Sequence, residues 1–186
     1  PVRSEGFVQP YCDGPLNDKN PAEELYMQIL NTAQRYVYIT TPYLILDSEM
    51  TTVLCLAAKS GIDVRIITPK VRDKWYVHPV TQYSYEELLE AGIRIYEYTP
   101  GFIHSKIFVS DDRVATVGTV NMDFRSFYFH FECGAWISNM DVVGDIKEDV
   151  LRIMEVSEEI RLDKWRKRPL SQKFKQSILH LFAPFM

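Results

Sequence analysis

Apolar and polar positions follow two different periods along this chain, and the change from one to the other predicts alternating strands and helices. Residues 36–40 (YVYIT) and 63–68 (DVRIIT) are short runs rich in β-branched side chains, which is typical of buried strands. Between them, residues 47–60 carry apolar side chains at helical intervals and are followed by Gly61, a residue that commonly ends a helix. These three segments predict a strand, a helix and a second strand.

The flanking segments extend the pattern. Residues 20–35 predict a helix that begins at Asn20, because Pro21 occupies the first helical position and Glu23 the third. The same signals predict a helix over 79–91 stopped by Gly92, strands over 93–98, 103–110, 113–117 and 131–137, a helix from Asp141 to about Ile160, and a last helix from Ser171. Strands that alternate with helices predict an α/β fold with a mostly covered sheet.

The composition agrees with a packed domain. The chain has 186 residues, of which 46% are hydrophobic and 13% aromatic, enough to build a core. No apolar stretch reaches the roughly 18 residues of a membrane span. The chain opens at Pro1 without an initiator Met or a signal-peptide pattern, so we expect it to be part of a longer protein. Cys12, Cys55 and Cys133 form no CxxC pair and are expected to be reduced, buried thiols.

Charge is distributed unevenly along the sequence. Seven basic residues and one acidic residue lie between Arg161 and Lys175, a local charge of +6, and subtracting this from the net charge of −4 leaves −10 for the rest. An acidic body argues against nonspecific nucleic-acid binding, which requires many phosphates to be neutralised. We therefore divide the chain into a domain of residues 1–160 and a basic amphipathic extension of residues 161–186. The extension predicts either an interfacial membrane segment or a helix docked on the domain with a solvated basic face.

The candidate chemistry lies in two short motifs. They are HxKxxxxD, made by His104, Lys106 and Asp111, and GTxN, made by Gly118, Thr119 and Asn121. Residues two apart on a strand face the same side, so His104 and Lys106 are expected to converge, and so are Thr119 and Asn121 after the flexible Gly118. Asp111 and Asp112 resemble a hairpin turn. Asp111 lies seven positions from His104, an odd number, so on a regular strand it would point to the opposite side. It is therefore expected to belong to the turn or to a structural ion pair.

These residue types suit phosphodiester chemistry. A neutral imidazole can attack phosphorus and give a phosphohistidine, while a second, protonated imidazole gives a proton to the leaving alcohol. Lys106 would neutralise the non-bridging oxygens, and Thr119 and Asn121 would donate hydrogen bonds as charge grows in the transition state. The motif occurs once, so the second imidazole has to come from elsewhere. The HxK spacing and the scattered carboxylates match no zinc pattern, and no metal or other cofactor is expected.

Several further residues have two interpretations each. Glu132 is either a partner that fixes the tautomer of His104 or a surface carboxylate at a strand end. Tyr43, which follows a strand end, either lines a substrate channel or is an ordinary core aromatic. Three other histidines lack the xK context and are interpreted as surface or core residues: His78, His130 and His180.

The stretch HSKIFVSDDRVATVGTVNMDFRS, with the HFE that follows, resembles the HKD motif of the phospholipase D superfamily. TPYLILD, SYEELLEAGIRIYEYTPGFIHSK and NMDFRSFYFHFE resemble bacterial cardiolipin synthases in particular, and the resemblance extends from about Pro10 to Met186. It implies a C-terminal phospholipase D domain with one HKD motif and a mixed sheet sandwiched between helices. Preceding membrane helices and a first HKD domain are implied for the complete chain. The family's active-site positions coincide with His104, Lys106, Asn121 and Glu132, and Thr119 stands where Ser is more common.

The resemblance also implies an activity: transfer of a phosphatidyl group between two phosphatidylglycerol molecules, giving cardiolipin and glycerol. His104 would be the general acid. If two copies of the chain pair as a homodimer, one of the two His104 rings would have to be the nucleophile. The implied partners are phosphatidylglycerol, an anionic membrane surface and the N-terminal HKD domain, at the cytoplasmic face of the cell membrane, with this fragment itself soluble. The alternatives are a hydrolase or nuclease of the same superfamily, or a lipid-binding half that is inactive when isolated.

Overall fold

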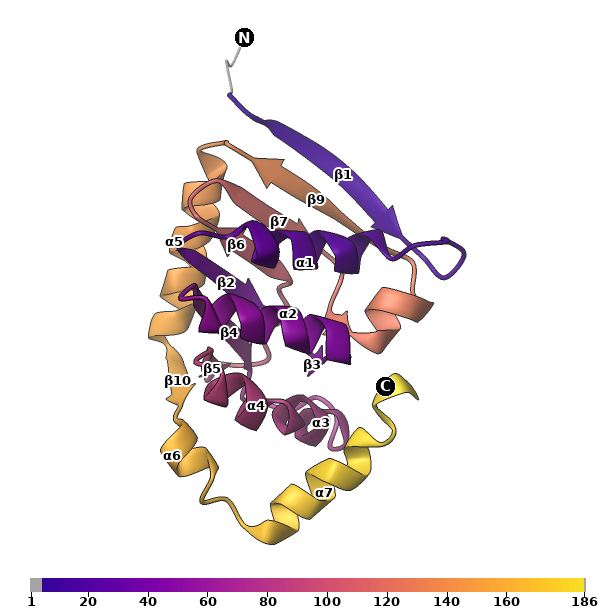
Figure 1. Cartoon of the computed structure of the whole chain (residues 1–186), viewed down its shortest axis with the longest axis vertical. Helices are drawn as coiled ribbons and strands as arrows, with labels where there is room; N and C mark the ends of the chain where they lie inside the picture. Colours follow the sequence, from indigo (N-terminus) through magenta and orange to yellow (C-terminus); the bar gives the residue numbers. More distant parts are fainter. Residues whose placement is uncertain (1–4, 186) are drawn as a thin grey trace.

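The computed structural model describes residues 5–185, and its centre is an eight-stranded mixed sheet (Figure 1). The strand order is β1-β9-β7-β6-β2-β4-β5-β10, with β2, β4 and β5 parallel and the other neighbours antiparallel. Two further short strands, β3 and β8, form a separate parallel pair. The strands are β1 Phe7–Asp13, β2 Tyr36–Thr40, β3 Leu44–Ile45, β4 Asp63–Pro69, β5 Arg94–Tyr98, β6 Ile107–Ser110, β7 Val114–Gly118, β8 Met122–Asp123, β9 Glu132–Ser138 and β10 Ser157–Ile160.

Helices cover both faces of the sheet. α1, α2 and α4 pack on one face and α5 packs on the other (Figure 1). The helices are α1 Pro21–Thr32, α2 Ser48–Lys59, α3 Val77–Tyr83, α4 Tyr85–Glu90, α5 Val142–Glu155, α6 Leu162–Trp165 and α7 Leu170–His180, with a π-helical turn over Arg125–Phe129 and a 3-10 turn over Ala183–Phe185. The predicted α/β class, with a mixed sheet between helices, is confirmed.

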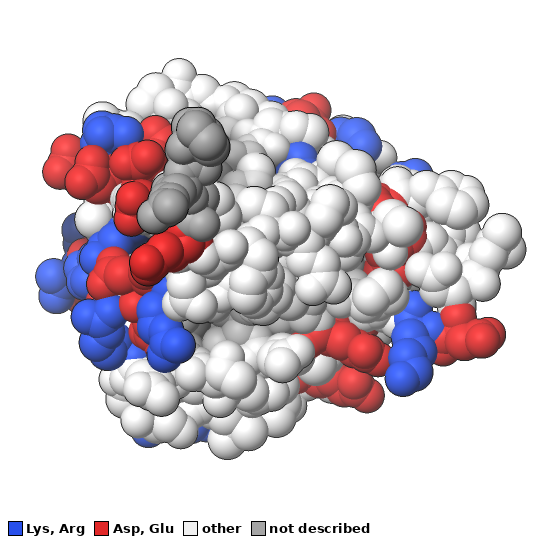
Figure 2. All heavy atoms as spheres, turned by 90° about the horizontal axis from the view of Figure 1, so that it is seen from above, with Lys and Arg blue, Asp and Glu red and all other residues white. Residues whose placement is uncertain are grey.

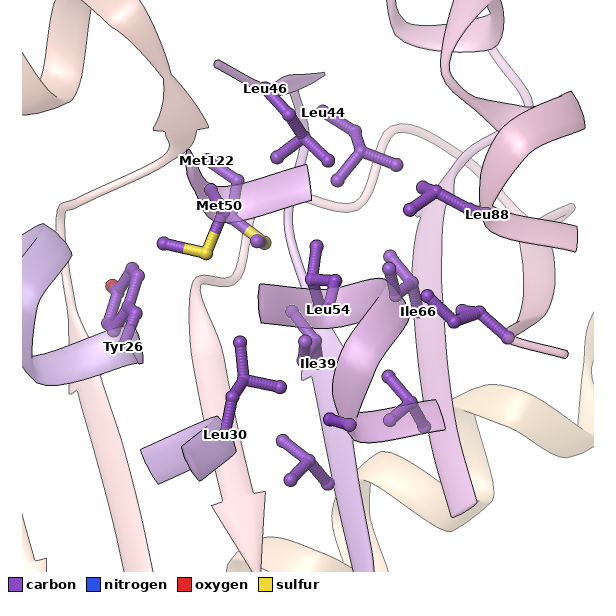
Figure 3. Close-up of a cluster of buried hydrophobic side chains, with 14 of the residues drawn as sticks. Tyr26, Leu30, Ile39, Leu44, Leu46, Met50, Leu54, Ile66, Leu88 and Met122 are labelled. Atoms are coloured by element: carbon purple, nitrogen blue, oxygen red, sulfur yellow. The ribbon is translucent and has the colours of Figure 1, made fainter. Parts of the chain in front are cut away.

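The alternation within β2 explains how one strand supplies two cores. Val37 and Ile39 point into the larger cluster under α1 and α2, whereas Tyr36 and Tyr38 point into the smaller cluster under α5. In the larger cluster Ile39 and Ile66 lie beneath Leu54 of α2 (Figure 3). The central strands are therefore fixed from both sides, which gives the loops at their ends a rigid base.

Two predicted helices differ from the structure at their ends. The helix expected over residues 20–35 stops at Thr32, because the carboxylate of Asp111 accepts hydrogen bonds from the backbone amides of Gln34 and Arg35. Asn20 occupies the N-cap position but makes no capping side-chain bond, and Asp13 of β1 instead accepts from the amide of Ala22 at 3.0 Å. The helix expected over residues 79–91 is two helices, α3 and α4, that meet at Ser84.

Two other boundaries are corrected. The strand expected over residues 103–110 begins only at Ile107, because pairing with β2 and β7 starts there. The helix expected to reach Ile160 ends at Glu155, and Ser157–Ile160 forms β10 at the edge of the sheet. Its two glutamates pair with basic side chains on and beside β5, so cross-strand charges support a strand that its composition does not favour.

The first strand was not predicted. β1 contains Pro10, a residue that strands tolerate at a sheet edge, and β1 is an edge strand paired only with β9.

The expectation of buried thiols holds for Cys55 alone. Cys12 and Cys133 are exposed free cysteines at paired positions of β1 and β9.

The C-terminal segment wraps around one end of the domain. After β10, α6 packs against α4 and α7 packs against α3, and the chain then turns back toward β3 (Figure 1). The ring of His180 stacks on Tyr83 with centroids 3.9 Å apart. Within residues 5–185, no helix is long and apolar enough to cross a membrane.

The surface viewed from the β1 edge is largely uncharged, and Lys, Arg, Asp and Glu side chains gather at its sides (Figure 2). Phe7 and Val8 of β1 are among the exposed apolar residues. Positive and negative side chains are interspersed where they occur, so this face carries no continuous basic surface.

Candidate active site

His104 and Lys106 lie together in the unpaired segment that leads into β6. Lys106 Nζ is 3.0 Å from Nδ1 and 3.3 Å from Nε2 of His104, and it donates a hydrogen bond to the His104 carbonyl at 2.7 Å. The imidazole is exposed to solvent, whereas Lys106 is only 7% exposed. The two side chains thus converge as their spacing indicated, although the segment is not part of the paired strand.

The electrostatics of this pair favour a neutral ring. Burial lowers the pKa of His104, and the adjacent Lys106 ammonium lowers it further, against an opposing effect of Asp73. Burial also lowers the pKa of Lys106, and the carboxylates of Glu132 and Asp123 counteract that shift. Since the ordinary pKa of histidine is about 6.5, the His104 imidazole is neutral at neutral pH, the state of a nucleophile or general base.

The other motif residues form a second hydrogen-bonded group. Asn121 Nδ2 donates to Ser126 Oγ at 3.0 Å, and Ser126 Oγ donates to Glu132 Oε1 at 2.9 Å. The other oxygen of the Glu132 carboxylate accepts from the Thr119 hydroxyl. Glu132 therefore accepts from two hydroxyl groups, and within residues 5–185 the His104 ring donates no hydrogen bond to it, the contact that one of its two interpretations required. The Thr119 hydroxyl likewise points to this carboxylate.

Asp111 lies at the other end of β6 from the imidazole. It sits in a turn with Asp112, and both residues have positive φ, 56° and 60°. Its carboxylate accepts from the amides of Gln34, Arg35 and Tyr36 at 2.7, 2.9 and 3.0 Å. The structure thus places Asp111 in a turn, where it ties the end of α1 and the start of β2 to β6.

Gly118 occupies a position with no room for a side chain. A Cβ atom there would lie 2.5 Å from the carbonyl oxygen of Cys133 and 2.7 Å from the Cα of Gly134, both on β9. The close approach of these two strands places Thr119 beside Glu132. Backbone proximity, rather than flexibility at Gly118, accounts for the glycine of the GTxN motif.

Some residues near the site were not identified from the sequence. Asp123 is buried, its carboxylate accepts from the Ser126 amide at 2.7 Å, and burial raises its pKa. The Asp-x-x-Ser spacing is a signal that could have indicated this local cap. Asp73 accepts from the Tyr43 hydroxyl at 2.6 Å. No sequence pattern pointed to this contact, because residues 30 positions apart share no period.

Two cavities bear on where a substrate can bind. A cavity of about 10 Å³, room for roughly one water, lies beside Tyr43 and Phe102, so a channel for an acyl chain is not formed there by the described residues. The Tyr43 ring is 6.2 Å from Phe102, which is 5.9 Å from the His104 ring. A cavity of about 480 Å³ lies between α1 and the β1 side of the sheet, and Ser110 and Asp111 line it. It therefore opens at the end of β6 opposite His104.

The remaining histidines have other surroundings. His78 is partly buried beside the small cavity, His180 stacks on Tyr83, and His130 is exposed with Nδ1 3.8 Å from Glu132 Oε1. Within residues 5–185, no group of three or more His, Cys, Asp and Glu side chains is arranged to hold a metal ion.

Comparison with known proteins gives consistent matches. The family model described as "Cardiolipin synthase, PLD-like domain" matches residues 26–154. A protein named cardiolipin synthase from Geobacillus sp. (strain WCH70) is 38% identical over 182 residues, covering 98% of this chain and 36% of that protein. The chain spans 35–40% of the length of the curated relatives it matches.

Solved structures support the fold. The phospholipase D family member Nuc from Salmonella typhimurium superposes with a TM-score of 0.72 at 17% identity, covering 84% of this chain and 99% of Nuc. Phosphatidylserine synthase from Haemophilus influenzae Rd KW20 also gives a TM-score of 0.72 at 17% identity, covering 96% of this chain and 45% of that protein.

Proposed function

This chain belongs to the family of cardiolipin synthase PLD-like domains, and we propose that it supplies one of the two HKD motifs of a phosphatidyl transferase. The observation that carries the proposal is the contact between the exposed His104 imidazole and the buried Lys106 ammonium. A neutral ring and an ammonium 3.0 Å from its Nδ1 are suited to a phosphodiester, whose phosphorus would bond to a ring nitrogen while its oxygens contact the cation.

The proposed reaction has two displacement steps. A neutral imidazole nitrogen bonds to phosphorus of phosphatidylglycerol, the bond from phosphorus to the glycerol oxygen breaks, and a protonated second imidazole gives glycerol its proton. The hydroxyl of a second phosphatidylglycerol then attacks phosphorus and gives its proton to that second ring. The phosphorus–nitrogen bond breaks, and cardiolipin leaves.

The residues around the ring have distinct parts in this proposal. Lys106 has to leave the ring nitrogens to contact the phosphate oxygens, and Asn121 retains a second amide hydrogen beyond the one given to Ser126. Thr119 and Ser126 hold the Glu132 carboxylate, which supports the charge of Lys106. Donation from Thr119 to the phosphate requires its hydroxyl to turn away from Glu132.

The protonation state of His104 decides its part. In this chain the ring is neutral, which suits the nucleophile. The general-acid role implied by the family resemblance requires a raised pKa. A bound phosphodiester would supply this, because a negative charge beside an imidazole stabilises the protonated ring. We therefore propose that His104 becomes the general acid only with substrate bound and a second HKD motif present.

The substrate is proposed to be an anionic lipid rather than nucleic acid. The chain carries a net charge of −4, whereas binding to a nucleic-acid backbone requires many basic side chains to neutralise its phosphates. The complete protein is proposed to act at the cytoplasmic face of the cell membrane, where phosphatidylglycerol is available.

Product analysis tests the proposal. The 186-residue chain and a longer protein that contains it with a second HKD motif are each incubated with phosphatidylglycerol vesicles. We expect cardiolipin and glycerol in equal amounts from the longer protein. His104→Ala should lower the rate on the order of 10³-fold or more, because the chemical step loses an imidazole. Leu56→Ser, on the outer face of α2, is the control and should retain the rate.

Other outcomes would contradict the proposal. Phosphatidic acid in place of cardiolipin would identify a hydrolase of the same superfamily. Lipid binding without any product from the longer protein would identify a binding module. Full turnover by His104→Ala would show that the site is assigned to the wrong residues.

A further inference from the structure

α7 presents an apolar face on the side that points away from the domain. Its inner side is anchored by Gln176, which is buried, and by Leu179, which packs on the small cluster around Ile45. Leu170, Phe174 and Leu181 lie on the opposite side and are 81%, 67% and 75% exposed. A helix docked on a domain normally has a polar outer face, so this pattern is reversed.

The exposed side chains form one continuous stripe. Positions four apart along a helix lie above one another, and the apolar stripe continues into the 3-10 turn at the C-terminus. We call this set the α7 stripe: Leu170, Phe174, Ile178, Leu181, Phe182 and Phe185, all exposed. Single exposed apolar residues are ordinary, whereas a contiguous set of this size marks a surface that another body covers.

Charge indicates what covers the stripe. From Lys164 to Met186 the sequence has six basic residues and no acidic one. Arg166, Arg168 and Lys173 pair with glutamates of α4, but Lys167 and Lys175 form no ion pair within the described residues. Lys175 instead lies 5.5 Å from the centre of the exposed Trp75 ring. Apolar side chains flanked by unpaired lysines, with an aromatic ring nearby, suit the interface of an anionic bilayer.

The turn that ends the stripe is anchored in the cluster that also contacts Tyr43. Ala183, in the turn that ends the stripe, is buried in the cluster against which Tyr43 packs. Tyr43 is one ring contact from Phe102, and Phe102 is one ring contact from His104. Figure 1 shows the C-terminus returning to the neighbourhood of β3, the strand that follows Tyr43. The buried side of this turn is therefore connected to the imidazole through packed rings.

We propose that the α7 stripe docks this domain on the surface of a bilayer that contains phosphatidylglycerol, with α7 lying in the plane of the interface. The inference rests on the proposed function for its choice of lipid, but its test measures binding and not turnover. The docking orients the domain so that headgroups reach His104 from the side of Tyr43. It requires no insertion of a spanning helix.

Vesicle binding by the 186-residue chain tests the proposal. The chain carrying both Phe174→Ser and Leu181→Ser is compared with the unmodified chain on vesicles of phosphatidylglycerol and of phosphatidylcholine. We expect the unmodified chain to prefer phosphatidylglycerol and the double variant to bind it on the order of ten-fold more weakly, because interfacial binding scales with buried apolar area. Leu56→Ser, an exposed apolar residue on α2, is the matched control and should bind as the unmodified chain does.

Three outcomes would overturn the proposal. The double variant could bind phosphatidylglycerol vesicles as tightly as the control. The unmodified chain could bind both vesicle types equally, which would show that the negative charge of phosphatidylglycerol does not contribute to binding. The double variant could bind vesicles normally but lose self-association in sedimentation, which would make the stripe a contact between protein chains. Circular dichroism melting of each variant checks that the fold is retained.

A separate variant distinguishes this inference from the proposed function. His104→Ala should lose turnover in the longer protein and bind vesicles as the unmodified chain does. If the longer protein makes no cardiolipin while the stripe variant still binds more weakly, the docking surface stands and the proposed reaction fails. If turnover is as proposed and the stripe variant binds normally, the docking surface fails alone.

Discussion

The two ends of β6 carry the two halves of one sequence motif and have different environments. At its start, His104 is exposed, and its ring lies beside the Lys106 ammonium and the Phe102 ring. At its end, Asp111 binds three successive backbone amides and holds two other elements in place. The His104 ring is accessible to a substrate, whereas the Asp111 carboxylate already accepts three backbone hydrogen bonds.

The contrast indicates that one motif has an exposed end, which suits the proposed chemistry, and an end that stabilises the fold. The four residues of β6 lie between the two ends, so the turn at Asp111 and the segment with His104 and Lys106 are joined by one buried strand. If this separation is correct, substitutions at the histidine end should change activity with little change in stability. Substitutions at the aspartate end should have the reverse effect.

After His104→Ala, the strongest loss of activity is expected for Lys106→Met. Removing the cation should lower the transferase rate of the complete protein by about 10²- to 10³-fold, since the developing charge on phosphate loses its partner. The stability should change by less than about 1 kcal/mol, because Met fills the buried site without the cost of desolvating an ammonium. Rate measurements and urea unfolding check both parts. A large fall in the unfolding free energy would show that Lys106 is a structural residue.

The next effect is expected at the other end of the strand. Asp111→Ala should lower the free energy of unfolding by about 2 to 3 kcal/mol, because three backbone amides lose a charged acceptor. The rate per folded molecule should stay within about two-fold of the original, since the imidazole is not touched. Asp111→Asn, which keeps one acceptor oxygen, is the milder control. An unchanged melting temperature together with a lost rate would reverse the comparison.

A third prediction concerns Glu23, a buried residue of α1 that lies at neither end of β6. Burial and the neighbouring Asp47 carboxyl raise the pKa of Glu23 to about 7. Because this folded-state pKa lies above the unfolded value near 4.5, its contribution to stability is present at pH below about 4.5 and is lost as the pH rises through about 7. Glu23→Gln removes that titration. The free energy of unfolding that the variant gains over the unmodified chain should therefore be larger at pH 8 than at pH 5, by about 1 to 2 kcal/mol.

Chemical unfolding of both forms across this pH range measures the difference. Glu24→Gln, on an adjacent and exposed position of α1, serves as the control and should not change the pH dependence. An identical dependence in Glu23→Gln and the unmodified chain would exclude Glu23 as its source.

The smallest effect is expected for Thr119→Ser. Both residues carry a hydroxyl that can donate to Glu132, so the rate should change by no more than a few-fold and the stability by less than about 0.5 kcal/mol. Thr119→Val keeps the shape and removes the hydroxyl, leaving the carboxylate one donor short. It should cost about ten-fold in rate. Equal rates for Ser and Val would show that the hydroxyl has no part in the reaction.

Much of the fold could be predicted from the sequence because periodicity reports burial. The runs that became β2 and β4 bury nearly every residue, and the helix between them shows Asp47 as a capping residue at its start. The elements that periodicity missed are fixed by tertiary contacts. β1 contains a proline and depends on its partner β9, and β10 depends on ion pairs with residues on or beside β5.

Prediction of the candidate site was limited in the same way, because contacts between distant segments leave no periodic signal. The two-residue spacing of His104 and Lys106 was sufficient to predict their convergence, since it is a local property. The partners of Glu132 could not be predicted, because the close approach of Gly118 to β9 brings the Thr119 hydroxyl to this carboxylate. Asp73 belongs to a loop that the sequence does not relate to residue 104, and only the structure brings it near.

A nuclear magnetic resonance titration of His104 tests the central claim most directly, namely that His104 and Lys106 act as one phosphate-binding pair. We predict that its pKa in the free chain lies below about 6.5, that sulfate raises it as a stand-in for phosphate, and that Lys106→Met raises the starting pKa and weakens the sulfate effect. A His104 pKa at or above 6.5 that responds neither to sulfate nor to Lys106→Met would contradict the account.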